Sequence, residues 1–370
     1  MVVRLQAGRR RLGWWRAHAA VLVAALATAS GVSRAAAPPL APVEAGEEPI
    51  ASWSTPLGAL RYVPGRGLQV GDTGLTLGGY TNATLRRDEG SEASFNLEEL
   101  SLFVIYEPLS RLRFFSELEY DDVFDIDTSG DSESREESAT VERLYLDFGL
   151  SDAVNLRTGI FLTPVGRWNV IHAAPLVWTT SRPLSTRIPF DPNVTGAMLS
   201  GAFFPENGVV TYSLFDQFAG PIEGNPDFDP ADHSVGARVQ YDAERGWSVG
   251  SSYVAARRDG CWRHLGGIDA LWSLPPIEVM GEAVADAGEG GEPQWGFYLQ
   301  PVLAVSERLA LVFRYEHFAP AGSPPQVNVL TMGFAFRLLP TVVFKSEYQV
   351  VDRSTSVAPA GLRASIAVLL

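Results

Sequence analysis

Apolar and polar side chains alternate with a period of two residues from Leu75 to the end of the chain. Leu112 and Leu118, for example, share one parity, whereas Arg113 and Glu117 share the other. Successive side chains of a β-strand point to opposite faces, so this period indicates strands with one apolar and one polar face. No segment after residue 35 approaches the roughly 20 uninterrupted apolar residues of a membrane-spanning helix. The pattern therefore predicts an all-β chain.

Turn-forming residues divide this region into sixteen expected strands, with short and long links alternating between them. The expected strands are 75–86, 94–106, 111–121, 139–149, 153–163, 195–204, 208–216, 234–242, 246–257, 262–273, 276–286, 294–305, 308–318, 327–338, 341–351 and 361–370. Outer-membrane barrels join their strands by tight turns at one end and longer loops at the other. We therefore predict a transmembrane antiparallel up-and-down β-barrel of 16 strands, with 14 or 18 strands left open.

The position of aromatic residues supports this arrangement. Tyr106 and Trp272 lie on the apolar parity beside short links, whereas Trp295 and Tyr315 lie on it beside long links. Amphipathic rings favour the two interfaces between a membrane and water. Two aromatic girdles are therefore expected around the barrel.

The first residues have the composition of an export signal. Arginines such as Arg9 and Arg10 precede an apolar run over residues 17–30, and Ser33-Arg34-Ala35 fits a small-x-small cleavage site. We expect a signal peptide over 1–35, a periplasmic N-terminal segment or linker without period over 36–73, and the barrel over 74–370. A membrane anchor is the alternative for the apolar run, which is shorter than a helix needs to span a bilayer.

Charge and motifs exclude several classes of function. The formal net charge of −14 argues against nucleic-acid binding, which needs a basic surface. Cys261 is the single cysteine, so no intrachain disulfide can form. The chain lacks the His-Glu-x-x-His motif of zinc enzymes and the Gly-x-Ser-x-Gly motif of hydrolases. We expect no catalytic residues, no metal and no cofactor, and hence no enzyme.

Several short motifs resemble those of the phosphate-selective porin O/P-like superfamily. These are Gly67-Leu68, Leu77-Gly78-Gly79-Tyr80 and the strand end Gly159-Ile160-Phe161-Leu162-Thr163-Pro164-Val165-Gly166. The resemblance implies a homotrimer in the outer membrane of a Gram-negative bacterium, in contact with lipid and lipopolysaccharide, with the third long loop folded into the lumen. Residues 361–370 resemble the C-terminal signal of outer-membrane proteins, which implies recognition by the barrel-assembly machinery. Inward charges are nearly balanced, so phosphate transport stays open.

A barrel of about 16 strands encloses an aqueous lumen that something must narrow. The longest link after residue 75, residues 164–195, is the candidate, since long loops in compact domains are commonly functional. The residues expected at the constriction are Arg167, His172, Arg182, Arg187 and Asp191 of this loop and Arg113, Glu117, Glu119 and Glu282 of the wall. Loop arginines facing wall glutamates would create a transverse field that filters polar solutes. Arginines that only brace the loop are the alternative.

The expected function is passive diffusion of small hydrophilic solutes or ions through a porin. A hydrophobic-substrate transporter, or a plugged barrel with an adhesion or structural role, is the alternative. The second long link, residues 122–138, holds seven acidic residues and one arginine. Carboxylates could bind divalent cations there, but the link has no EF-hand register, so a solvated surface loop is the other reading.

Overall fold

The structure is a computed structural model that describes residues 49–56, 58–127, 138–151, 153–220, 231–289, 291–322, 325–355 and 357–370. The expected signal peptide and residues 128–137 of the acidic link lie outside these residues. No helix within the described ranges is long and apolar enough to cross a membrane.

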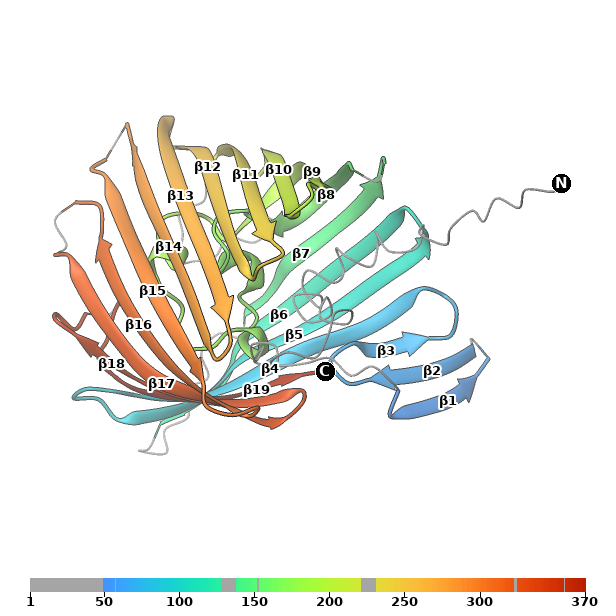
Figure 1. Cartoon of the computed structure of the whole chain (residues 1–370), viewed down its shortest axis with the longest axis horizontal. Helices are drawn as coiled ribbons and strands as arrows, with labels where there is room; N and C mark the ends of the chain where they lie inside the picture. The colour runs from blue at the N-terminus through green and yellow to red at the C-terminus, as the bar shows by residue number, and fades with distance from the viewer. Residues whose placement is uncertain are drawn as a thin grey trace.

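Sixteen antiparallel strands form a closed barrel (Figure 1). Their bounds are β4 Leu75–Asp88, β5 Ala93–Leu109, β6 Leu112–Asp127, β7 Ser138–Gly149, β8 Asn155–Leu162, β9 Asn193–Phe203, β10 Gly208–Ala219, β11 His233–Ala243, β12 Trp247–Arg258, β13 Cys261–Leu274, β14 Ile277–Gly288, β15 Gln294–Ala304, β16 Leu309–Ala319, β17 Val327–Leu339, β18 Val342–Val351 and β19 Gly361–Leu369. Each strand pairs with the next, and β19 pairs with β4 to close the ring. The predicted fold class and strand count are confirmed.

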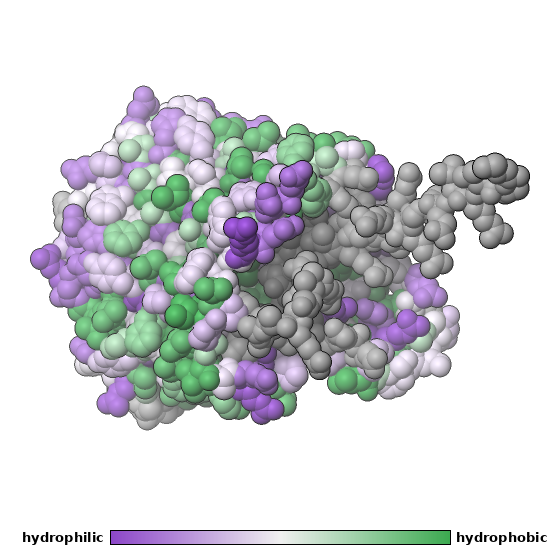
Figure 2. All heavy atoms as spheres, viewed as in Figure 1, coloured by the Kyte–Doolittle hydropathy of each residue, from purple (hydrophilic) through white to green (hydrophobic). Residues whose placement is uncertain are grey.

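The two faces of the barrel wall differ as the alternation predicts. Leu102, Leu118 and Leu146 point outward and are exposed, whereas the inward-facing Glu117 and Arg314 are 0% exposed. Figure 2 shows hydrophobic residues spread over much of the face in view, with hydrophilic residues gathered along its left edge. A closed barrel with this apolar exterior is the architecture that spans outer membranes, where it leaves no unpaired strand edge in lipid.

Exposed outward-facing aromatic side chains lie at both ends of the barrel. Tyr106 and Trp272 are beside short turns, and Trp295 and Tyr315 are beside the opposite ends of their strands, all four exposed. The two expected girdles are therefore present.

Three features depart from the sequence expectations. Strand β6 extends to Asp127, into a stretch expected to be loop. The link between β12 and β13, expected to be a longer one, is the tight turn Asp259-Gly260, in which both residues have positive φ. A two-residue hairpin turn requires that conformation, and Asp-Gly supplies it. Loop length therefore does not alternate strictly around the barrel.

The third departure is a ribbon of short strands in the segment expected to be irregular. It consists of β1 Ala51–Thr55, β2 Gly58–Val63 and β3 Gly67–Val70. Strand β3 pairs with the first residues of β4, with Leu68 opposite the outward-facing Leu77. The ribbon therefore continues the barrel sheet beyond the end of β19, and Figure 1 shows it projecting from the wall beside β4.

Candidate functional site

The connection from β8 to β9, residues 163–192, folds into the barrel. It contains the short helices η1 Asn169–Ile171, η2 Ala174–Leu176 and α2 Leu184–Arg187. Its apolar side chains are enclosed: Val165 is 1% exposed, Trp168 3% and Phe190 5%. These residues pack against inward-facing side chains of the wall, such as Val284 and Tyr298. The prediction of a long third loop inside the lumen is confirmed.

Carboxylates of the opposite wall accept hydrogen bonds from backbone N–H groups of this loop and from the indole N–H of Trp178. A loop with little regular structure leaves backbone N–H groups that need acceptors, and an ionised carboxylate is a strong one. The bonds are Trp168 N to Glu282 Oε1 at 2.7 Å, Trp178 Nε1 to Glu278 Oε1 at 2.8 Å, Thr180 N and Ser181 N to Glu347 at 2.9 Å each, and Leu184 N to Glu316 Oε2 at 2.8 Å.

Two inward-facing cations bind the loop's carbonyl groups. Lys345, which is 1% exposed, donates to the carbonyl oxygens of Ala174 at 2.9 Å and Thr179 at 3.0 Å. Arg314 donates to the carbonyl oxygen of Ser181 at 2.9 Å. Both the N–H groups and the carbonyl groups of the loop are thus hydrogen-bonded to side chains of strands β14, β16 and β18. It lies along this side of the lumen as a fixed part of the wall.

The loop arginines expected at the constriction have separate surroundings. Arg167 donates to Ser248 Oγ and lies 3.9 Å from the carboxylate of Asp269. Arg182 donates to Asn169 Oδ1 at 2.6 Å. Arg187 donates to the carbonyl oxygen of Val357 at 2.7 Å, close to the loop between β18 and β19.

Arg182 and His172 lie near the acidic side of the barrel. Nε2 of His172 is 3.8 Å from Glu142, and Nδ1 lies 3.0 Å from the carbonyl oxygen of Asn169. Burial, reinforced by the positive charge of Arg182, lowers the pKa of His172 to about 4. Burial also lowers the pKa of Arg182, to about 10, against the attraction of Glu142 and Glu282. At neutral pH, therefore, Arg182 is charged here and His172 is not.

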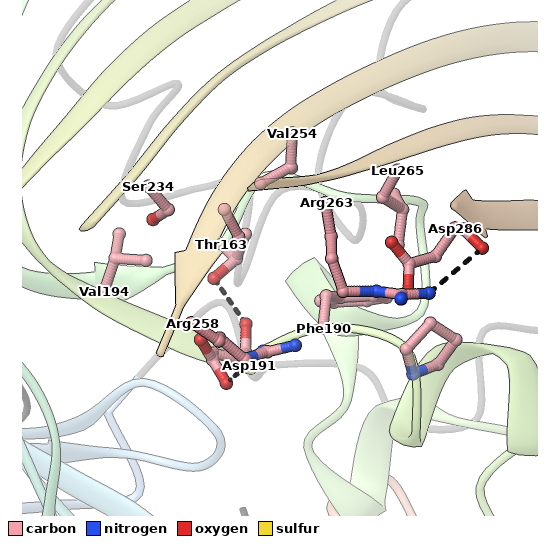
Figure 3. A pocket seen from close by; sticks show the side chains of 12 residues that line it. Thr163, Phe190, Asp191, Val194, Ser234, Val254, Arg258, Arg263, Leu265 and Asp286 are labelled. Atoms are coloured by element: carbon pink, nitrogen blue, oxygen red, sulfur yellow. Dashed lines mark hydrogen bonds and ion pairs between the residues drawn. The ribbon is translucent and has the colours of Figure 1, made fainter. Parts of the chain in front are cut away.

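Asp191 ties the end of the loop to the barrel. Its Oδ1 accepts from Arg258 at 2.8 Å and its Oδ2 from the amide of Ala231 at 3.1 Å. Figure 3 shows this pair beside a second one, Arg263 with Asp286, around a cavity of about 20 Å³. Both acids are neutralised by the neighbouring arginine. The cavity has room for about one water molecule.

Three of the four expected wall residues, Arg113, Glu117 and Glu119, lie on β6, whereas the fourth, Glu282, lies on β14. Glu117, which is 0% exposed, is paired with Arg143 and accepts from Ser101 at 2.9 Å. The guanidinium of Arg113 lies 5.6 Å from the ring centre of Phe115. Glu282 binds the loop amide described above and the hydroxyl of Tyr298 at 2.7 Å.

Glu119 belongs to a group of inward-facing acids that the sequence reading assigned only in part. Bulges between Leu97 and Glu99 and opposite Glu117 shift the pairing by one residue. Glu98 and Glu99 consequently both reach inward-facing partners, and Glu142 joins Arg143 on the inside. Under strict alternation, one residue of Glu98 and Glu99, and one of Glu142 and Arg143, would face lipid. A charged side chain facing lipid is unfavourable, and this was the one sequence signal that could have indicated the bulges. We call Glu98, Glu99, Glu119 and Glu142 the acidic wall.

No group of three or more His, Cys, Asp or Glu residues in the described part of the chain is arranged to hold a metal ion.

Comparison with solved structures places this fold among outer-membrane porins and channels. OmpT of Vibrio cholerae is similar over 80% of this chain and 97% of its own, with a TM-score of 0.57 at 9% identity. The outer membrane channel DcaP of Acinetobacter baumannii matches over 80% and 97% with a TM-score of 0.55 at 11% identity. An anion-selective porin from Comamonas acidovorans matches over 80% and 98% with a TM-score of 0.53 at 12% identity. At these identities the likeness shows the fold alone, which is that of an outer-membrane β-barrel.

Sequence comparison gives less. No family model matches the chain. An uncharacterized protein of Aquifex aeolicus is 34% identical over 116 residues, which span 31% of this chain and 26% of that protein. Kinship with the phosphate-selective porin O/P-like superfamily stays a prediction.

Proposed function

We propose that the chain is a porin through which small hydrophilic solutes or ions diffuse passively. One observation carries the proposal: loop 163–192 is fastened to strands β14, β16 and β18 inside a barrel of sixteen strands. A barrel of this size is too wide to be filled by its own side chains. A loop fixed to one side narrows the lumen without needing to move.

We further propose that the filter lies between the loop and the acidic wall. Arg182 lies on the loop, and its positive charge is attracted by Glu142 and Glu119 of the facing strands. Opposed charges across a narrow passage orient polar solutes and determine which ions pass more readily. The passage needs no cofactor, metal or catalytic group. Arg167, Arg187, Asp191 and Arg113 support this filter by holding the loop and wall in place.

The proposed setting follows from the same fold. The apolar exterior contacts outer-membrane lipid and lipopolysaccharide, and the alternating apolar residues of β19 serve as the signal for the barrel-assembly machinery. A similar structure, OmpT of Vibrio cholerae, was solved in a trimer form. This supports a homotrimer for the present chain.

A plugged barrel is the second candidate, favoured by apolar packing inside the lumen. Trp178 of the loop packs with Tyr80, Val312 and Leu369, from strands on both sides of the closure of the ring. If this packing seals the barrel, the protein would serve a structural or adhesive role instead.

Swelling of liposomes in sugar solutions distinguishes the two. A porin admits small sugars, and the rate falls steeply with sugar size. Vesicles carrying the folded protein that swell no faster than empty ones would contradict diffusion. The variant R182A should change the permeability to charged solutes more than to neutral sugars, because it removes charge from the passage. An equal effect on both would assign Arg182 to bracing.

A further inference from the structure

Six arginines of the barrel strands are each neutralised in a close pair with a carboxylate. These pairs are Arg143–Glu117, Arg157–Asp147 at 2.8 Å, Arg238–Asp269 at 2.5 Å, Arg258–Asp191 at 2.8 Å, Arg263–Asp286 at 2.9 Å and Arg314–Glu316 at 2.7 Å. Paired charges at such distances contribute little net potential to the lumen. The charge sensed by a passing solute is therefore set by the groups outside these pairs.

The acidic wall is one group of charged residues outside these pairs, and Arg182 of the loop faces it. Within the described residues, none of its four carboxyl groups forms an ion pair with an arginine or lysine. Its nearest basic ring, that of His172, is uncharged at neutral pH, as its lowered pKa shows. Glu98 is exposed, whereas Glu119 is 9% exposed. The donors to its carboxylates are neutral groups: the Tyr80 hydroxyl for Glu99, Asn82 and Thr84 for Glu98, and Asn193 for Glu142 at 3.2 Å. The wall therefore has hydrogen-bond donors but no ion-pair partner among the described arginines and lysines.

A second observation points to an absent donor at the same place. Asn82, on the neighbouring strand β4, is 3% exposed, and its Nδ2 donates to Glu98 Oε2 at 3.0 Å. Its Oδ1 is enclosed and accepts no hydrogen bond. The hydroxyl of Thr84 already donates to the same Glu98 oxygen, at 2.5 Å. Buried acceptors are nearly always satisfied, so this oxygen is expected to take a donor from outside the chain, either from water or from a bound solute.

The chemistry of the site selects among cations. The acids are not arranged to chelate a metal, as the absence of a metal-binding group among the described residues shows. An ammonium or guanidinium group carries several N–H donors that can serve several oxygens at once. Such charge-assisted bonds are roughly twice as strong as neutral ones. An organic cation therefore suits the acidic wall better than a bare metal ion.

We propose that the acidic wall and Asn82 form a binding subsite for solutes carrying ammonium or guanidinium groups, and that the channel consequently prefers cations. The preference rests on the proposed porin function, but binding to the subsite does not. The subsite gives the protein a preference for cations, opposite to the selectivity named for the anion-selective porin of Comamonas acidovorans, despite the shared fold.

Two measurements on the full chain, purified from outer membranes, test this proposal. The first is reversal potential in a potassium chloride gradient across a planar bilayer, with 1,4-diaminobutane then added as a blocker. The second is calorimetric binding of 1,4-diaminobutane to the protein in detergent, with 1,4-butanediol as the neutral probe of equal length. The test variants are E98Q/E99Q and the milder E98Q, and E206Q in an exposed turn is the control that matches the charge change of E98Q. Heat-modifiable migration on gels verifies that each variant is folded.

The wild type and E206Q should prefer potassium over chloride and bind the diamine. E98Q/E99Q should lower the cation preference and weaken diamine binding by about tenfold or more, a loss of about 1.4 kcal/mol. Preference for chloride in the wild type, or diamine binding unchanged by E98Q/E99Q, would overturn the subsite. Silent bilayers with intact, E98-dependent diamine binding would refute the porin and retain the subsite, so the two failures are distinguishable.

Discussion

Glu347 provides a direct test of how the luminal loop is held. Its two carboxylate oxygens accept the amides of Thr180 and Ser181, each at 2.9 Å, so each oxygen serves one donor. In the variant E347Q one side-chain oxygen remains as an acceptor. The new side-chain NH2 group would face one of the two backbone N–H groups, so that two donors meet. A hydrogen bond to a charged group contributes about 1.5–3 kcal/mol. The variant should therefore lose about 2–3 kcal/mol of loop docking.

Hydrogen exchange at these two amides measures that loss. At about 1.4 kcal/mol per factor of ten, the protection of Thr180 and Ser181 should fall by about 30- to 150-fold. Mass spectrometry of peptides from residues 178–186 reports the change. E206Q, which removes an equal charge from an exposed turn, should leave it unaltered. Unchanged exchange in folded E347Q would refute the assignment of Glu347 as an anchor of the loop.

Three further outcomes follow from the structure. His172 has a pKa of about 4 in the folded chain against an ordinary 6.5, so the unfolded chain takes up its proton first as the pH falls. The contribution of His172 to stability against urea should thus fall by about 3 kcal/mol between pH 6.5 and 4, and the wild type should lose more stability over this range than H172Q; an equal change in H172Q would contradict it. R143Q leaves the buried Glu117 unpaired and should cost about 3–5 kcal/mol, much of it recovered in R143Q/E117Q; a double variant as unstable as R143Q would refute the pairing. Cys261, the single thiol, follows the turn Asp259-Gly260, which lies at the end of the barrel opposite the turn that contains Glu206. An impermeant maleimide should therefore label Cys261 on intact cells, whereas E206C in a C261S background should react only after permeabilisation. The reverse labelling would invert the topology.

Most of the barrel could be predicted from the sequence because lipid imposes period-two alternation on every strand. The pattern identified β14 and β18, for example, to within two residues of their observed ends. The β1–β3 ribbon was missed because its strands are only four to six residues long and are separated by turns. The hairpin turn Asp259-Gly260 carried a readable signal, since Asp-Gly favours a two-residue turn, but counting link length concealed it.

The candidate site was less predictable than the fold. The sequence indicated which loop enters the lumen and that it carries arginines. It could not indicate that Glu316, Glu347 and Lys345 fasten the loop, because those contacts join segments more than 130 residues apart. It also could not indicate that Glu98 and Glu99 share one face, because a bulge suspends the alternation on which the assignment depended.

Single-channel conductance of the full chain in planar bilayers tests the central claim most directly. A lumen narrowed by a docked loop predicts stepwise, ohmic conductance that is steady in the wild type and becomes larger or unsteady in E347Q. Folded protein that inserts into the bilayer and carries no current, in both the wild type and E347Q, would contradict a water-filled passage.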